Sequence, residues 1–73
     1  MKKLNGFQRQ ILLDALKVWQ EAAIEENREI VKSGKMPLFT EGYIHMEVEE
    51  LKDVINSLTT KKALKEANKS VGI

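Results

Sequence analysis

Residues 6–33, GFQRQILLDALKVWQEAAIEENREIVKS, decide the fold because they read as one uninterrupted helix. Asn5 is a good N-cap for this helix, and Gln8, three residues later, can complete a capping box. At the other end, Gly34 can adopt the left-handed conformation that stops a helix, and Pro37 lies just beyond it. These signals predict a helix over about 6–33, roughly 42 Å long at 1.5 Å per residue.

This predicted helix is apolar over more of its circumference than one neighbouring helix can cover. Apolar side chains plotted at 100° per residue fill an arc of about half the circumference. The arc consists of Phe7, Ile11, Leu12, Ala15, Leu16, Val18, Trp19, Ala22, Ala23 and Ile30. Leu13, Ile24 and Val31 form a second stripe outside the arc. We therefore expect a second molecule to contact this helix, with Trp19 and the three residues of the stripe at the interface.

A second helix is predicted over about 41–58, with Thr40 as its N-cap. Its apolar residues recur at spacings of four and three, which is typical of a narrow helix–helix seam. These residues are Ile44, Val48, Leu51, Ile55 and Leu58. The alternation of apolar residues from Tyr43 to Val48 also fits a strand, although a lone strand in so short a chain is marginal.

Residues 56–60 contain several weak helix formers, so the second helix can end there. The segment over about 60–69 then forms either a short third helix or a continuation of the second, with Ala63, Leu64 and Ala67 as the buried side. The connection over 34–40 is short, which favours an antiparallel helical hairpin. The sequence thus predicts an all-α fold in a single domain over 1–73.

The length and composition of the chain favour association with a second copy. A domain of 73 residues buries only about 60% of the surface of its unfolded chain, and it has no cysteine for disulfides. Charge is also divided along the sequence. Residues 1–20 carry four bases against one acid, residues 21–53 nine acids against four bases, and residues 54–73 four bases against one acid. In a hairpin this places both basic segments at one pole, so we expect an antiparallel homodimer that forms a helical bundle.

Few residues suggest chemistry. His45 lies one helical turn from both Glu41 and Glu49, and such a row can bind a metal weakly, but an exposed histidine beside acids is the more ordinary interpretation. The serines lie at predicted helix ends or in the tail, and no phosphate-binding or paired-acid motif is present. The sequence therefore predicts no catalytic residue, no cofactor and no enzymatic activity.

Two functions remain as hypotheses. The first is a small interaction module, an adaptor, inhibitor or regulator, that acts as a homodimer and binds a protein partner. The second is a nucleic-acid-associated regulator that uses a basic pole formed by Lys2, Lys3, Lys61, Lys62, Lys65 and Lys69. We prefer the first, because the only arginines are Arg9 and Arg28. The apolar runs are too short for a membrane span or a signal peptide, which predicts a cytoplasmic protein without membrane contact.

Overall fold

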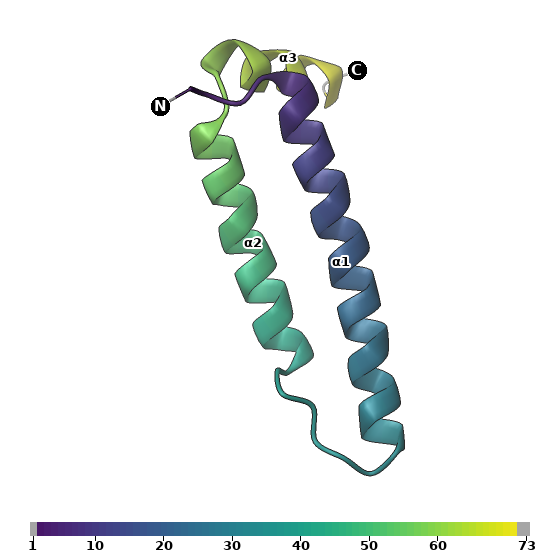
Figure 1. Ribbon diagram of the computed structural model, residues 1–73. Coiled ribbons are helices and arrows are strands. Elements are labelled where there is room, and N and C mark those ends of the chain that lie inside the picture. The colour runs from purple at the N-terminus through teal and green to yellow at the C-terminus, as the bar shows by residue number, and fades with distance from the viewer. Residues whose placement is uncertain (1, 72–73) are drawn as a thin grey trace.

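The computed structural model describes residues 2–71, and it describes side chains up to residue 67. Three helices follow one another along the chain: α1 (Gly6–Lys32), α2 (Glu41–Leu58) and α3 (Lys61–Val71). The first two run antiparallel and pack against each other, and α3 lies across the end of the hairpin where α1 begins (Figure 1). The all-α hairpin predicted from the sequence is confirmed for the described residues.

The start of α1 follows from its capping box. The backbone N–H of Gln8 donates to Asn5 Oδ1 (2.8 Å), and the backbone N–H of Asn5 donates to Gln8 Oε1 (3.0 Å). Each bond satisfies a donor that the first helical turn leaves without a partner. At the other end, Gly34 has a φ of 84°, a conformation that side-chain-bearing residues rarely adopt. Both predicted ends of this helix are therefore confirmed to within a residue.

The second predicted helix is also confirmed, and the alternative of a strand over 43–48 is wrong. Thr40 caps α2, since its Oγ1 accepts a hydrogen bond from the backbone N–H of Tyr43 (3.1 Å). The periodicity of four and three residues buries Ile44 and Val48 against α1, and Val48 is only 1% exposed. A helix is favoured over a strand here because the hairpin supplies a partner along the whole seam.

The break before α3 is real, so residues 41–71 form two helices. Thr59 has extended backbone angles, and its hydroxyl donates to the carbonyl of Ile55 (2.6 Å), which closes the last turn of α2. A one-residue parallel bridge follows: Leu4 donates to the carbonyl of Leu58 (2.7 Å) and accepts from the N–H of Thr60 (2.9 Å). This bridge, here called the clasp, ties the segment before α1 to the turn between α2 and α3.

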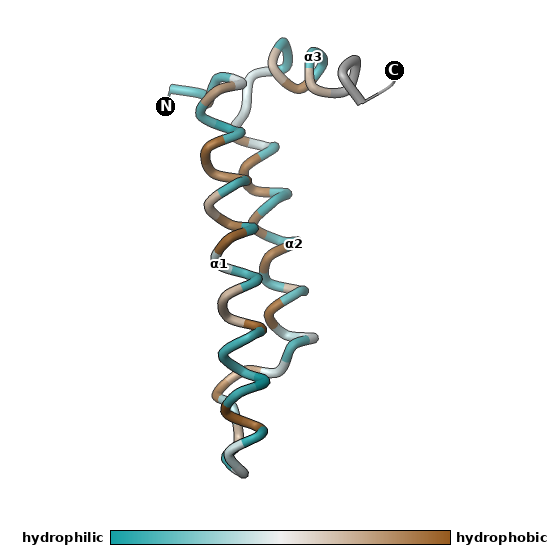
Figure 2. Tube along the Cα trace, turned by 90° about the vertical axis from the view of Figure 1, so that its right-hand side faces the viewer, coloured by the Kyte–Doolittle hydropathy of each residue, from teal (hydrophilic) through white to brown (hydrophobic). Residues whose placement is uncertain are grey.

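The molecule is thin and elongated. It measures 48 × 32 × 16 Å, and its radius of gyration is 15.6 Å, against about 11 Å for a compact chain of this length. In Figure 2, α3 projects to one side of the hairpin. Its Ala63 packs beside Gly6 of α1, where an added Cβ would lie 3.8 Å away. Ile44, Val48 and Ala63 are the only buried apolar residues among those described, so the core is small.

Candidate interaction surfaces

The side of α1 that faces α2 is partly polar. Its half-buried residues recur at alternating spacings of four and three, as a helix–helix seam requires. We call this set the inner seam: Arg9, Leu13, Leu16, Gln20, Ala23, Asn27 and Ile30. Three of the seven side chains are polar, and each makes a hydrogen bond across the hairpin or to its connection. The seam is therefore held by a mixture of apolar contact and hydrogen bonding.

One edge of this seam is closed by hydrogen bonds between the two helices. They join Arg9 Nε to Asn56 Oδ1 (3.0 Å), Gln20 Nε2 to His45 Nδ1 (2.7 Å) and Arg28 Nε to Glu41 Oε1 (2.8 Å). We call this the polar edge. The three bonds are spread along the length of the hairpin, so they fix the register of α1 against α2.

The opposite edge is apolar and exposed. Here Trp19 and Ala23 border a cavity of about 200 Å³ together with Phe39 and Ile44. Trp19 is 56% exposed. Leu12 lies two turns before it on α1, and Leu51 and Val54 follow Ile44 along α2, all between two-fifths and one-half exposed. We call Leu12, Trp19, Leu51 and Val54 the open face.

The most apolar line on α1 points away from α2. Its residues follow at spacings of four, four, three and four, and all are exposed. We call this set the outer seam: Phe7, Ile11, Ala15, Val18 and Ala22. Phe7 is 77% exposed, Val18 67% and Ile11 51%. In its first four turns, α1 thus presents a more polar side to its own partner helix than to solvent, the reverse of an ordinary amphipathic helix.

The four residues predicted to form an interface lie in different places. Leu13 and Ile24 are half-buried, Leu13 within the inner seam and Ile24 beside the polar edge. Trp19 belongs to the open face, and Val31, 58% exposed, borders a cavity at the tip of the hairpin. The structure does not bring the four into one patch, and their contact with a second molecule stays a prediction.

The outer seam belongs to the apolar arc predicted from the sequence, in which nothing distinguished it from the rest. The two sides differ in the positions of Gln20 and Asn27, which alternate with Leu16, Ala23 and Ile30 at spacings of four and three residues. Half-buried polar residues at these positions indicate the side that packs against α2, because their hydrogen-bonding partners lie in the same chain. The remaining part of the arc is then the part that α2 leaves uncovered.

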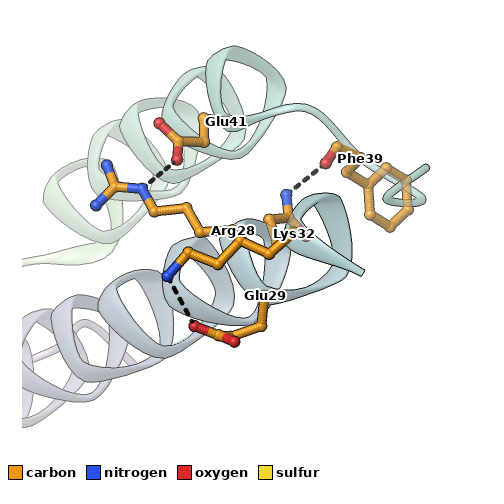
Figure 3. Close-up of polar contacts among 6 residues, drawn as sticks. Arg28, Glu29, Lys32, Phe39 and Glu41 are labelled. Atoms are coloured by element: carbon orange, nitrogen blue, oxygen red, sulfur yellow. Dashed lines mark hydrogen bonds and ion pairs between the residues drawn. The ribbon is translucent and has the colours of Figure 1, made fainter. Parts of the chain in front are cut away.

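The tip of the hairpin carries a hollow with an apolar lining and charged residues at its border. The cavity is about 510 Å³ and is bordered by Val31 and Pro37 between α1 and the connection to α2. Figure 3 shows the polar contacts at this tip: Arg28 pairs with Glu41, Lys32 pairs with Glu29 (3.4 Å), and the Asn27 amide donates to the carbonyl of Phe39. The hydrogen bond from Arg28 lowers the pKa of Glu41 below its ordinary value. Each of these charged side chains is therefore paired with an opposite charge of the same chain.

The row of Glu41, His45 and Glu49 is not assembled into a site. Glu41 binds Arg28, Glu49 binds Lys52 (3.2 Å), and the His45 ring contacts Gln20. Among the described residues, no group of three histidines, cysteines or acids lies close enough to hold a metal ion. The contacts of these side chains serve the hairpin itself.

The two basic segments do meet at one end of the hairpin. The clasp brings Lys2 and Lys3 to the same end as Lys61, Lys62 and Lys65 of α3. Lys3 Nζ donates to the carbonyl of Ser57 (2.9 Å), and the other four lysines are exposed. The side chain of Lys69 lies outside the described residues. The pole predicted from the charge pattern therefore exists for the described lysines.

Comparison with protein-family models, with curated proteins and with solved structures finds no match for this chain. None of the described helices combines the length and the apolar character that crossing a membrane demands. The surfaces of the chain itself therefore carry the functional inference.

Proposed function

We propose that this protein is a small non-enzymatic interaction module, which acts as a homodimer and docks on a protein partner as an adaptor, inhibitor or regulator. The outer seam carries this proposal, because five apolar residues in line on a rigid helix lie exposed to water. Complete burial of a side chain such as Phe7, Ile11 or Val18 is worth about 1.5–3 kcal/mol relative to exposure. Covering the seam with a second copy recovers much of that free energy.

The total surface of the chain supports the same proposal. The accessible area is 6107 Å², whereas a compact monomer of 8.3 kDa has about 4,600 Å², so the excess is about 1,500 Å². A stable interface of standard size buries about 800 Å² on each partner. One such contact removes about half of the excess, which leaves room for a second surface that binds a different protein.

The two exposed apolar surfaces divide these roles. The outer seam is straight and narrow and includes two alanines, which suits close packing against another helix. The open face is broader and contains Trp19, and tryptophan is enriched at the hot spots of protein interfaces. We assign the outer seam to the second copy and the open face to the partner protein.

The dimer is tested by placing a charge in the outer seam. Sedimentation equilibrium at micromolar concentration should give twice the 8.3 kDa chain mass for the wild type. Val18→Asp should give a monomer, because its carboxylate would have to be desolvated at the interface. Met46→Asp is the matched control, since Met46 is a half-exposed apolar residue on α2 outside both surfaces, and it should remain dimeric.

A wild-type chain that sediments as a monomer up to 100-fold higher concentration would contradict the proposal. Equal dissociation of Val18→Asp and Met46→Asp would contradict it as well. Circular dichroism of both variants accompanies the measurement, so that loss of the dimer is not mistaken for loss of the fold.

A nucleic-acid binder is the second candidate, and the meeting of two basic segments at one pole favours it. Such a protein would bind duplex DNA at low salt and lose affinity steeply as salt rises, because it releases counterions from phosphates. An interaction module should bind the DNA weakly, and its affinity for DNA should not fall steeply as salt rises. Titration of labelled DNA in two salt concentrations separates the two functions.

A further inference from the structure

The bases of the two hairpin helices lie away from the open face. There are five of them in α1 and α2: Arg9, Lys17, Arg28, Lys32 and Lys52. Three border one cavity along the polar edge, together with Gln20 and Asn56. Arg28 and Lys32 border a second cavity nearer the tip. Neither cavity includes a residue of the open face, so the positive charges of α1 and α2 gather on the other side of the hairpin.

Acidic side chains, by contrast, border the open face from both helices. Glu26 of α1 lines the cavity that Trp19 borders. On α2, Glu47 and Glu50 each precede an apolar residue of the open face by one helical turn, so they lie on the same side of that helix. Glu26 and Glu50 are exposed, and Glu47 is half-buried. The open face is therefore an apolar surface with acids at both flanks.

The register of the hairpin brings the acids of α2 close to the tryptophan of α1. Gln20 pairs with His45 across the hairpin (2.7 Å). Because the two helices run antiparallel, Trp19 lies level with position 46 and next to the level of Glu47. An apolar group that covers Trp19 must therefore pass between acids of α1 and α2.

Two aromatic rings connect these acids to the apolar cavity. Tyr43 stacks on Phe39 with 5.4 Å between ring centroids, and Phe39 borders the same cavity as Trp19. The charge of Glu47 raises the pKa of Tyr43 above its ordinary value, and a hydrogen bond between these two side chains and the charge of Glu50 act in the same direction. The negative field of α2 thus extends to the aromatic residues beside the open face.

We propose that the partner of the open face is an amphipathic helix with basic side chains on both sides of its apolar stripe. This inference rests on the proposed interaction module and adds the chemistry of its partner. A helix laid along the open face would contact apolar residues of α1 and α2 together and complete a three-helix bundle. Its basic flanks would meet Glu26 on one side and Glu47 and Glu50 on the other.

The open face has the length and the access that such a helix needs. From Leu12 to Ile30, which borders the cavity beside Trp19, α1 extends for about 27 Å. The third helix does not cover this side. Its Ala63 packs beside Gly6, which lies about five helical turns before Ile24 and so on the flank of α1 next to the polar edge.

Trp19 is the only tryptophan of the chain, so its fluorescence reports binding at the open face. The probe is a synthetic helical peptide of about 18 residues, without tryptophan, that has leucine in one stripe and lysine at its flanks. A second peptide has glutamate in place of every lysine. At low salt, the lysine peptide should shift the Trp19 emission to shorter wavelength and bind about tenfold more tightly than the glutamate peptide. Rising salt should reduce this ratio, because the charges are screened.

Charge reversal at the flank of the open face locates the contact. Glu47→Lys combined with Glu50→Lys should weaken binding of the lysine peptide by about tenfold and strengthen binding of the glutamate peptide. Glu21→Lys with Glu25→Lys is the matched control, because both acids border the cavity beside Ile24 and not the open face. It changes the net charge equally and should alter the affinity less than about twofold. If circular dichroism shows that the first double variant loses helix, Glu50→Lys alone, at an exposed position, should give part of the effect.

Equal affinity for the two peptides, or equal losses in the two double variants, would overturn the proposed chemistry of the partner. A shift of the Trp19 emission with phosphatidylglycerol vesicles but not with the lysine peptide would overturn it in favour of a lipid surface. Sedimentation distinguishes these failures from failure of the homodimer. The dimer should persist with the lysine peptide bound, and its dissociation by the peptide would overturn the inference, since the open face would then belong to the second copy. A monomeric wild type that binds the lysine peptide would contradict the homodimer and support the partner chemistry.

Discussion

The inner and outer seams of α1 occupy opposite sides of one helix and obey different rules. The inner seam accommodates Gln20 and Asn27 because both side chains form hydrogen bonds. Gln20 pairs with His45 of α2, and Asn27 donates to the carbonyl of Phe39 in the connection. The outer seam has only apolar residues and meets no described part of its own chain that buries it. The difference teaches that apolar content alone does not identify the side of a helix that a monomer covers.

The largest difference between the two sides is expected when the same substitution is made at a buried valine and at an exposed one. Val48 is 1% exposed, so Val48→Asp buries a carboxylate and costs several kcal/mol, against about 4–11 kcal/mol for the whole domain. Far-ultraviolet circular dichroism at 25 °C should show loss of most helix. Val18→Asp should keep its helical spectrum, because Val18 lies on the outer seam.

Cooperative thermal unfolding of Val48→Asp at the wild-type temperature would show that the packing of Val48 against the inner seam does not hold the monomer together. Equal loss of helix in the two variants would instead show that the hairpin does not fold without its second copy.

The polar edge provides a test of intermediate size. Asn56 is half-buried and accepts a hydrogen bond from Arg9 Nε (3.0 Å), so Asn56→Ala should reduce the free energy of unfolding by about 1 kcal/mol. Asn56→Asp keeps an acceptor for the guanidinium and should lose little. Urea denaturation followed by circular dichroism measures both. If the two substitutions cost the same, the bond contributes nothing to the register of the hairpin.

The smallest effect on stability is expected for the exposed ion pair between Arg28 and Glu41, at the end of the polar edge near the tip. Arg28 lowers the pKa of Glu41 below its ordinary value of 4.5, so the ionised carboxylate is favoured in the folded chain. Its contribution to stability is present above the ordinary pKa and disappears as the pH falls through the lowered value. Glu41→Gln should therefore melt slightly below the wild type at pH 7, and the two should melt together at pH 2.

High salt should also narrow that difference at pH 7, because both side chains are exposed and their attraction is screened. A melting difference that persists at pH 2 would show that Gln disturbs the first turn of α2 by some route other than charge.

The sequence alone predicted the parts of this fold that depend on local signals. Asn5 with Gln8, Gly34 and Thr40 each set a helix end through bonds within a few residues, and such bonds need no knowledge of the tertiary structure. The break at Thr59 could not be decided between two alternatives, because its extended backbone is stabilised by Leu4, which lies far away in the sequence.

The candidate surfaces were predicted less well, for a related reason. A helix with apolar residues around half of its circumference offers several sides to a neighbour, and the choice among them depends on distant partners. Gln20 paired with His45 and Arg9 paired with Asn56 turn α1 so that Leu13 is partly covered and Val18 is not. These pairings require the register of the hairpin, which the one-dimensional pattern of apolar residues does not contain.

The clasp joins two segments that lie far apart in the sequence. Leu4 leaves the ribosome long before its backbone partners at Leu58 and Thr60, since both helices of the hairpin are synthesised in between. Closing so long a loop costs conformational entropy, and packing of α1 against α2 shortens the loop that is left to close, so we expect the two helices to align before the clasp forms. The segment around Leu4 is therefore synthesised before the two helices, and we expect its backbone bridge to form after they have packed.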